Sequence, residues 1–349
     1  MVAAGWVDPA GAGMIGAANL TGYLVGALSG RQVARRVGTA TTLDIGMGLA
    51  AAAFAACAWQ GGLLYLACWR GLAGVAGGLL MALAGPAVQW AVAASRRGQA
   101  GGIVVSGVGS GAVLSALVLP NVVPLGLTTA WLVLAGLVVV LWGLVHRSWP
   151  DAPIPPASQG EGRVRGAVRL LAIYALSGAG MVAHMVYLVD LAVRGRGMSA
   201  AAGATIWLLF GVGAVVGTLA GGRMADRWGA SRALSVWLGI QIVAIGAAMI
   251  SGTVVLGVAG LLGGFAGVGI SAVGLARSRE IGGARTSSVW AGATAAYAAA
   301  QAATAFGLAA LLARTASHEA LFGACLLLSA AGLVISLVPA GSAAAVGDA

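Results

Sequence analysis

Apolar residues in this chain fall into long runs separated by short polar stretches rich in arginine and glycine. Each run comes close to the ~20 residues that an α-helix needs to cross a bilayer. The pattern predicts membrane-spanning helices at about 10 to 30, 39 to 59, 64 to 93, 100 to 120, 128 to 145, 169 to 193, 203 to 221, 233 to 251, 254 to 276, 288 to 313 and 320 to 338. We therefore expect an all-α polytopic membrane protein with eleven spans.

The polar stretch at 146–168 divides these spans into two sets. It holds four of the nine prolines together with serine, glutamine and glycine, a composition that suits an extended, poorly ordered linker. We expect an N-terminal transmembrane half at 1–145, a cytoplasmic linker at 146–168 and a C-terminal transmembrane half at 169–349.

The two halves carry a repeated segment, which predicts two pseudo-symmetric helical bundles of the transporter kind. Residues 22–38 match residues 213–229 at eight of seventeen positions without a gap. Each copy is expected to end an apolar helix and make a short arginine-bearing turn. Glycines recur every four residues in both copies, at Gly22, Gly26 and Gly30 and at Gly213, Gly217 and Gly221. Because this spacing lets helices approach closely, we interpret them as packing surfaces.

Composition and charge place the chain in the membrane with a defined orientation. It is 60% hydrophobic and 8% charged, which leaves too little polar surface for a water-soluble globule. The net charge is +10, every basic residue other than histidine is an arginine, and most of the arginines lie in short loops, so a nucleic-acid partner is not expected. Since arginine-rich short loops stay in the cytoplasm, we expect the N-terminus outside, the C-terminus inside, and a location in the cell's inner or plasma membrane.

The end of the second repeat copy carries a recognisable motif. Gly222, Asp226, Arg227, Gly229 and Arg232 resemble the G-x-x-x-D-R-x-G-x-x-R signature of the major facilitator superfamily. The first copy, at Gly30, Arg35, Arg36 and Gly38, is similar but has Arg35 in place of the aspartate. The segments at 17–28, 206–217 and 295–307 further resemble the YbfB/YjiJ-type branch. The resemblance covers nearly the whole chain and implies a secondary transporter that works by alternating access.

Physical reasoning gives this motif a gating role. The Asp226 carboxylate can accept backbone N–H bonds at the N-terminus of a neighbouring helix, where the helix dipole favours negative charge. The expected partner is the span that starts near Ala100, preceded by Arg96 and Arg97. Such a contact would hold the cytoplasmic side closed. The alternative is that the arginines only set the topology and that Asp226 neutralises one of them.

Ionisable residues inside the spans are candidates for the substrate pathway, because a charge in hydrocarbon needs a cavity or a partner. Arg70 lies inside a span, and His184, Tyr187 and Asp190 step by three along another. Arg70 is expected to approach Asp190 or an anionic solute. In the alternative, Asp190 pairs locally with Arg194, and His184 is a core histidine.

Two amides complete the list of candidates. In the superfamily arrangement the second and eleventh helices pack together, and Asn19 and Gln301 lie near the middle of the corresponding spans. A buried amide seeks a partner in lipid. We expect the two side chains to approach each other, directly or through a shared water, in at least one state.

The leading hypothesis is a secondary active transporter of a small organic solute, with a proton or other gradient as the driving force. The alternatives are a transport-inactive scaffold or sensor with the same fold, and a drug or metabolite efflux pump. We expect no enzyme activity, no cofactor and no metal site, and the protein is expected to act as a monomer. No nucleotide-binding motif is present.

The repeat also predicts a missing element. Subtracting the 191-residue offset from the span at 169–193 places its mate before Met1. Superfamily members usually have twelve spans, so the resemblance implies that the first helix is lacking here. We expect a shortened form in which one wall of the cavity is open and transport is poor.

Overall fold

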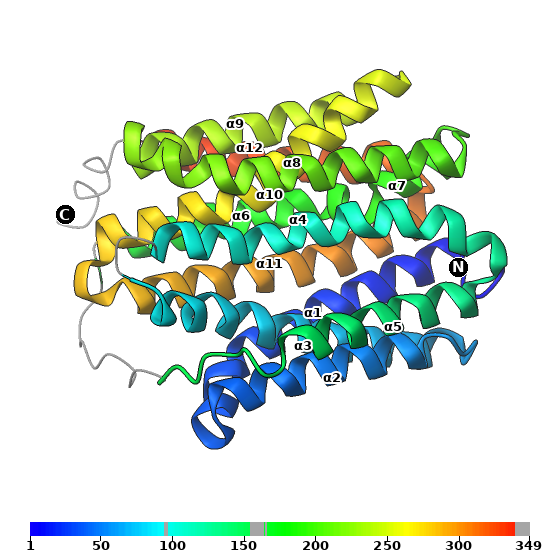
Figure 1. The fold of residues 1–349 in the computed structure, drawn as a ribbon. Helices are drawn as coiled ribbons and strands as arrows, with labels where there is room; N and C mark the ends of the chain where they lie inside the picture. The colour runs from blue at the N-terminus through cyan, green and yellow to red at the C-terminus, as the bar shows by residue number, and fades with distance from the viewer. Residues whose placement is uncertain (94–96, 154–163, 165, 339–349) are drawn as a thin grey trace.

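The computed structural model describes residues 1–93, 97–153, 164 and 166–338. Within these residues eleven helices are long and apolar enough to cross a membrane, which confirms the all-α prediction. They lie side by side along one direction (Figure 1). The main helices are α1 (Pro9–Val37), α2 (Thr39–Ala56), α3 (Gly62–Ala91), α4 (Arg97–Val122), α5 (Leu127–Val145), α6 (Ala167–Val182), α8 (Ala200–Trp228), α9 (Ala230–Met249), α10 (Thr253–Gly282), α11 (Thr286–Thr315) and α12 (His318–Leu337).

Short helical elements extend or join some of these. The span that begins with α6 continues as a π-helical turn η3 (Ala183–Tyr187), the short α7 (Leu188–Asp190) and a second π-helical turn η4 (Leu191–Gly195). The 3-10 turns η2 (Val123–Leu125) and η5 (Gly283–Arg285) precede α5 and α11. The π-helical turns were not predicted, because apolar periodicity does not distinguish α from π hydrogen bonding.

The repeat copies do not contain the predicted turns. Both α1 and α8 continue through their arginines, and the chain reverses at a single glycine, Gly38 or Gly229. These glycines have φ values of 89° and 79°, a region that favours residues without a Cβ. Basic side chains at the end of a helix interact favourably with its dipole, so the arginines extend the helix beyond the apolar run.

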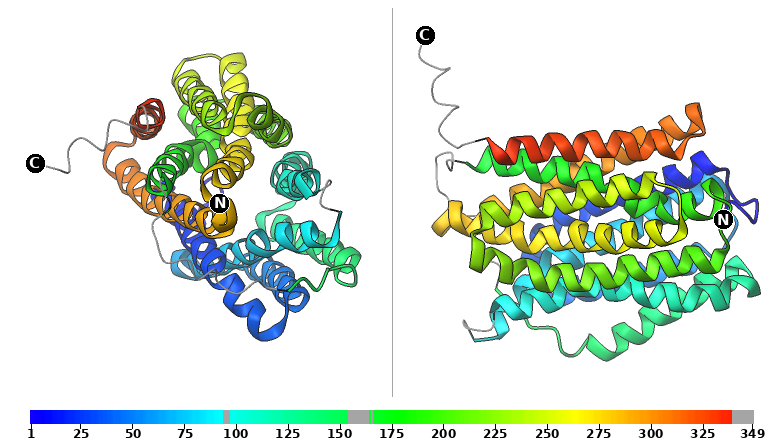
Figure 2. Two further views of the ribbon diagram at one scale, coloured as in Figure 1. Left: turned by 90° about the vertical axis from the view of Figure 1, so that its left-hand side faces the viewer. Right: turned by 90° about the horizontal axis from the view of Figure 1, so that it is seen from above.

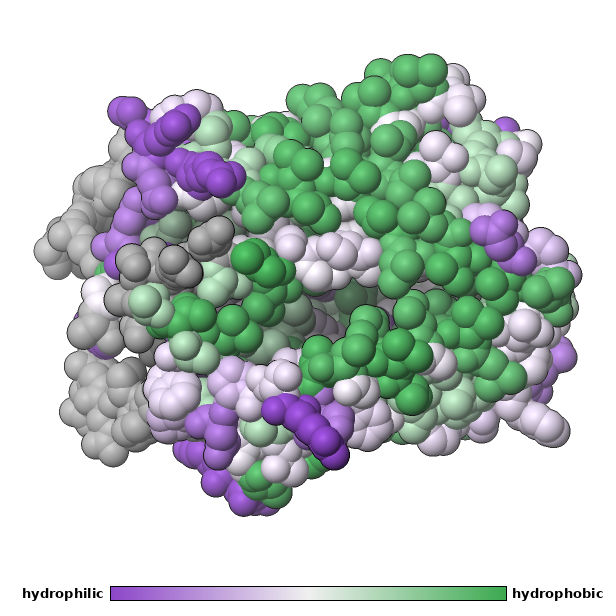
Figure 3. Space-filling model, viewed as in Figure 1, coloured by the Kyte–Doolittle hydropathy of each residue, from purple (hydrophilic) through white to green (hydrophobic). Residues whose placement is uncertain are grey.

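The bundle has two distinct ends. The arginine-rich end is the one at which six helices terminate, namely α1, α3, α5, α8, α10 and α12. We call the other end of the bundle the opposite end. The C-terminal side of α12 lies at the first of these, on the left in Figure 1, and the N-terminus lies at the second. Figure 3 shows polar residues gathered toward the ends and apolar residues over the middle of the molecule.

Matched glycine contacts in the two halves confirm the pseudo-symmetric arrangement. A Cβ placed on Gly22 would lie 1.9 Å from the Gly71 carbonyl oxygen, and one on Gly213 would lie 2.0 Å from that of Leu261. The next glycine of α8, Gly217, meets the Phe265 carbonyl in the same way, at 2.1 Å. The α1 and α8 glycines therefore allow backbone contact with α3 and α10, as the four-residue spacing predicted.

The two halves differ around the span that contains α6. In the second half this span packs against α10, α11 and α12. Among the described residues the first half has no corresponding helix beside α3, α4 and α5, and α4 and α5 are the least buried of the eleven spans. Figure 2 shows α4 standing apart from the rest of the first half when the bundle is viewed from its arginine-rich end. In Figure 3 the surface between α4 and α5 is recessed.

The start of the predicted linker is packed rather than free. The Asp44 carboxylate accepts the indole N–H of Trp149 at 3.0 Å and that of Trp142 at 2.8 Å. The Thr39 hydroxyl donates to the carbonyl of Ala152 at 2.7 Å. Residues 149–152 are thereby tied to the first half. The remaining prolines, Pro155 and Pro156, lie outside the described residues.

Candidate functional site

The hydrophobic cores show where the two halves meet and where they part. At the opposite end one core contains Ala17 and Leu20 of α1 together with residues of α8 to α12 and of the α6 span. At the arginine-rich end one core lies wholly in the second half and its linker, and a separate one lies wholly in the first half and the start of the linker. The halves therefore share a core at the opposite end only.

The residues of α1 that face the second half confirm this picture. A Cβ on Gly13 would lie 3.2 Å from the Ala309 Cβ of α11, and one on Gly16 would lie 3.1 Å from Val186 of η3. The predicted packing between the helices that contain Asn19 and Gln301 is thus confirmed. A second interface joins α4 to α8, where the Trp207 indole donates to the Ser115 hydroxyl at 3.2 Å.

His184 and Tyr187 lie in the shared core on the π-helical turn η3. Both side chains are buried, and neither imidazole nitrogen nor the phenol oxygen has a hydrogen-bond partner among the described residues. The His184 ring packs edge-on against Phe322 at 5.4 Å and fills the space left by Gly263. The Ala259 carbonyl is near the ring, but no hydrogen bond of normal geometry forms. Unpaired buried polar atoms destabilise a core, and π-helical turns are frequent at functional sites.

Asp190 and Arg70 do not meet in this conformation. The Asp190 carboxylate pairs with the Arg194 guanidinium and accepts a hydrogen bond from His318 Nε2 at 2.7 Å. Arg70 instead lies between two aromatic rings of the first half, 5.5 Å from the centroid of Phe54 and 5.6 Å from that of Trp131. Local pairing of Asp190 with Arg194, the alternative considered above, is what the structure shows. The contact with His318 was not predicted from the sequence.

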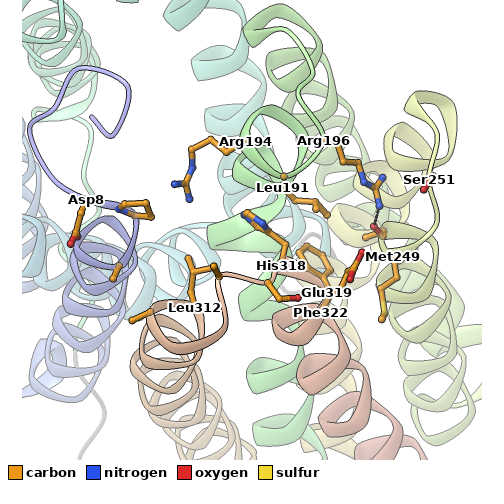
Figure 4. Close-up of a pocket in the computed structure, with 17 residues that line it drawn as sticks. Asp8, Leu191, Arg194, Arg196, Met249, Ser251, Leu312, His318, Glu319 and Phe322 are labelled. Carbon is orange, nitrogen blue, oxygen red and sulfur yellow. Dashed lines mark hydrogen bonds between the residues drawn. The ribbon is translucent and has the colours of Figure 1, made fainter.

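A cavity of about 850 Å³ opens at the opposite end of the bundle. It lies between the start of α1, the end of η4, the end of α9 and the turn from α11 to α12 (Figure 4). Arg196 donates to the Ala248 carbonyl at its wall. Burial lowers the pKa of the Arg196 guanidinium, and the nearby Glu319 carboxylate opposes that shift. Positive and negative side chains are mixed here, so the cavity has no single charge preference.

The predicted gating residues lie at the arginine-rich end. Asp226 is exposed on the last turn of α8 and has no hydrogen bond or ion pair among the described residues. Its expected partner was the N-terminus of the span that starts near Ala100, and Arg96, which precedes that span, lies outside the described residues. Gly222 and Arg227 lie on the same last turns, Gly229 forms the reversal, and Arg232 starts α9. In the first copy Gly30, Arg35 and Arg36 lie on the end of α1, and Gly38 follows it.

A different carboxylate caps a helix at this end. Glu280 of α10 accepts the backbone N–H of Ala230, the first residue of α9, at 2.7 Å, and pairs with Arg277 at 2.7 Å. The capping chemistry expected of Asp226 is therefore present in this structure on Glu280. Glu280 lies fifty residues from Ala230 in the sequence, outside the motif, so the motif did not predict this contact.

The two amides are not bonded to each other in this conformation. Gln301 is buried on α11 and its amide donates to the Met185 sulfur at 3.1 Å. Asn19 is half-buried on α1, where its backbone carbonyl contacts Gly74. Their direct approach remains a prediction for another state.

Comparison with known proteins agrees with this architecture. A family model described as "Uncharacterised MFS-type transporter YbfB" matches residues 1–340. A solved structure titled "Crystal structure of D-xylose-proton symporter" aligns with a TM-score of 0.75 and 17% identity, covering 93% of this chain and 85% of that one. A search of curated proteins gives no match. The family match over nearly the whole chain shows that this multi-pass membrane protein belongs to the YbfB-type family of the major facilitator superfamily and is a secondary transporter of small solutes, not an enzyme.

Proposed function

We propose that the conformation described here is open toward the arginine-rich end and that this end faces the cytoplasm. The observation that carries the proposal is the sharing of one core at the opposite end and the separation of cores at the arginine-rich end. Two bodies that are joined at one end and separate at the other leave a path on the separated side. The positive-inside rule supports the cytoplasmic assignment, because Arg31, Arg35 and Arg36 end α1 there and Arg227 ends α8.

In the proposed cycle the residues 1–145 and 169–349 move as two bodies around the solute. Asp226, exposed in the open form, gains a partner when the arginine-rich end closes. Contacts such as Gly16 with Val186 break when the opposite end opens. The helices α4 and α8 contact each other both at Ser115 with Trp207 and at Gly102 with Leu219, so the movement in this cycle is larger between α1 and α11.

The alternating movement can be tested without knowing the solute. Ala27 lies on the arginine-rich half of α1, and Val25 on the same helix has 52% of its surface exposed on another face. In a variant without native cysteines, Ala27→Cys should react with a membrane-impermeant maleimide in inside-out vesicles and not in right-side-out cells. Val25→Cys, which faces lipid in this arrangement, is the matched control and should react in neither.

A crosslink supplies the second half of the test. Gly16→Cys paired with Val186→Cys should form a disulfide that keeps Ala27→Cys reactive from inside and stops transport until it is reduced. Reactivity of Ala27→Cys only from outside would contradict the proposed orientation. Normal transport by the crosslinked protein would contradict alternating access along this interface.

We further propose that His184 carries the coupling proton, with Tyr187 beside it on the pathway. A buried imidazole with two unpaired nitrogens needs a partner in some step of the cycle, and a histidine changes its charge near neutral pH. For a solute found in an uptake screen, His184→Gln should abolish the stimulation of transport by a pH gradient. His146→Gln, at the exposed end of α5, is the control and should retain it. Full stimulation in His184→Gln would refute the coupling role.

The gate is proposed to depend on Asp226. Asp226→Asn removes the negative charge without altering the apolar spans, so membrane insertion should be unchanged while transport falls strongly. Arg35→Asn, at the matching position of the first copy, should have a smaller effect because an arginine cannot accept N–H bonds. Transport at the normal rate in Asp226→Asn would show that the residue only balances the charge of its neighbours.

A further inference from the structure

Three aromatic side chains of the second-half core at the arginine-rich end lie next to the level where the shared core ends. Tyr174 of α6 packs against Tyr297 of α11 with ring centroids 4.7 Å apart, and against Trp290 of the same helix at 5.6 Å. Tyr23 of α1 follows Leu20 of the shared core by one turn on the same helix face. We call Tyr23, Tyr174, Trp290 and Tyr297 the aromatic cluster. It draws residues from both halves.

Helix periodicity explains why Tyr23 faces the second half. Gly13, Gly16 and Leu20 of α1 contact the second half, and Tyr23 continues this face three residues further along the helix. On α11, Trp290, Thr294 and Tyr297 lie on one face at intervals of four and three residues. The shared core includes Ala17 and Leu20 of the α1 face but not Tyr23. Tyr23, Trp290 and Tyr297 consequently remain half-buried although they lie within spans.

Hydrogen bonds and small neighbours hold the rings in place. The Tyr174 hydroxyl bonds the Ser271 hydroxyl at 3.2 Å, and the Tyr297 hydroxyl donates to the Gly267 carbonyl at 3.3 Å. Gly178 provides the space for Tyr297, since a Cβ there would come within 2.8 Å of the ring. Each phenol oxygen that donates can still accept a hydrogen bond. The buried hydroxyl of Thr294, on the same face of α11, has no partner among the described residues.

The walls around this cluster carry no formal charge. No aspartate, glutamate, arginine, lysine or histidine occurs within residues 10–30, 170–183, 254–276 and 287–313, which form the central parts of α1, α6, α10 and α11. An ion placed here would lose its hydration without gaining a counter-charge, which is unfavourable. The arginines at the cytoplasmic mouth also repel cations before they reach the cluster. The site chemistry therefore favours a neutral molecule.

We propose that the aromatic cluster binds an uncharged organic solute that carries an aromatic ring and a hydrogen-bonding group, and that this is the transported solute class. The rings provide faces for stacking, and the phenol oxygens and the Thr294 hydroxyl provide hydrogen bonds. This inference rests on the proposed opening toward the arginine-rich end, since the cluster is reached from there.

Three probes of the same ring and different charge test this directly. Tryptophol is neutral, tryptamine is a cation and indole-3-acetate is an anion at pH 7. Binding of each tritiated compound to the whole protein in nanodiscs is measured, and binding to empty nanodiscs is subtracted. We expect tryptophol to bind at least about tenfold more tightly than either ion, which corresponds to ~1.4 kcal/mol. Tighter binding of tryptamine would overturn the neutral assignment, and equal binding of all three would overturn the site.

Variants locate the binding. Tyr297→Ala and Tyr23→Ala should each weaken tryptophol binding by about 2- to 10-fold through the lost ring contact. Tyr297→Phe keeps the ring and should weaken it less. Tyr65→Ala is the control, because Tyr65 lies on α3 near the opposite end, where it packs against Trp69. Unchanged binding in both Tyr23→Ala and Tyr297→Ala, with correctly folded protein, would refute the cluster as the site. The maleimide and crosslinking experiments are independent of the solute, so alternating access can succeed while this inference fails.

Discussion

Replacing Gly22 by alanine tests the backbone contact that joins α1 to α3. The new Cβ would lie 1.9 Å from the Gly71 carbonyl oxygen, 2.7 Å from its carbonyl carbon and 3.0 Å from the Val75 nitrogen. Because an ordinary carbon–oxygen contact is about 3.3 Å, the helices would have to separate by about 1.4 Å at this level. No side-chain rotation can relieve the clash, since both partners are backbone.

The expected magnitude follows from two opposing terms. Overpacking of this kind costs about 1 to 3 kcal/mol, whereas alanine in place of glycine favours a helix by about 1 kcal/mol. Because the contact is rigid, the overpacking cost for Gly22→Ala should lie near the upper limit of this range. We therefore expect the free energy of unfolding to fall by about 2 kcal/mol. At about 2 °C or more for each kcal/mol, the unfolding midpoint should fall by about 4 °C.

Thermal unfolding in detergent, followed by size-exclusion chromatography of the soluble fraction, measures this change. Gly107→Ala on α4 is the matched control, because nothing lies within 4 Å of its added Cβ. That variant should have an unchanged or higher midpoint. Gly213→Ala should reproduce the loss through the equivalent contact with Leu261. A midpoint for Gly22→Ala equal to or above that of Gly107→Ala would refute the close-contact reasoning.

Substitutions at three further residues test individual contacts by the same thermal assay. Glu280→Ala removes the cap on the Ala230 N–H and should cost about 1 kcal/mol; Glu280→Gln, which can still accept the bond, should recover part of it. Asp44→Ala removes the acceptor of two indole N–H groups, including that of Trp142, and should lower the free energy of unfolding by about 2 to 3 kcal/mol. An unchanged midpoint would show that these bonds are dispensable. Asp190→Asn weakens a partly exposed ion pair and should cost no more than about 1 kcal/mol, so a larger loss would point to a role beyond local pairing.

The sequence by itself determined the spans, their number and the two-fold arrangement. A helix that crosses lipid needs a long run of apolar residues, so the positions of the spans can be predicted from the sequence. Close helix contact requires residues without side chains, so the spacing of Gly22, Gly26, Gly213 and Gly217 predicted close-packing surfaces, and the structure shows backbone contacts there. These features depend on local chemistry that repeats along each helix.

Helix ends and partner choice were decided only in three dimensions. The arginines suggested turns in both repeat copies, but α1 and α8 extend through them to Gly38 and Gly229, because a helix can continue beyond the bilayer where its basic end is solvated. Asp190 had several candidate partners, and His318 was hidden from the sequence by a separation of 128 residues.

The candidate site divides in the same way. His184 was marked by its ionisable side chain inside an apolar span, and tertiary packing decided that it is buried without a partner. Tyr23 and Tyr297 carried no comparable signal, since a single tyrosine in a membrane helix is as compatible with packing as with binding. The packing of Tyr297 against Tyr174, and the place of Tyr23 on the α1 face toward the second half, depend on how α1, α6 and α11 are oriented about their axes. That orientation is set by contacts between residues far apart in the chain, so only the tertiary structure fixes it.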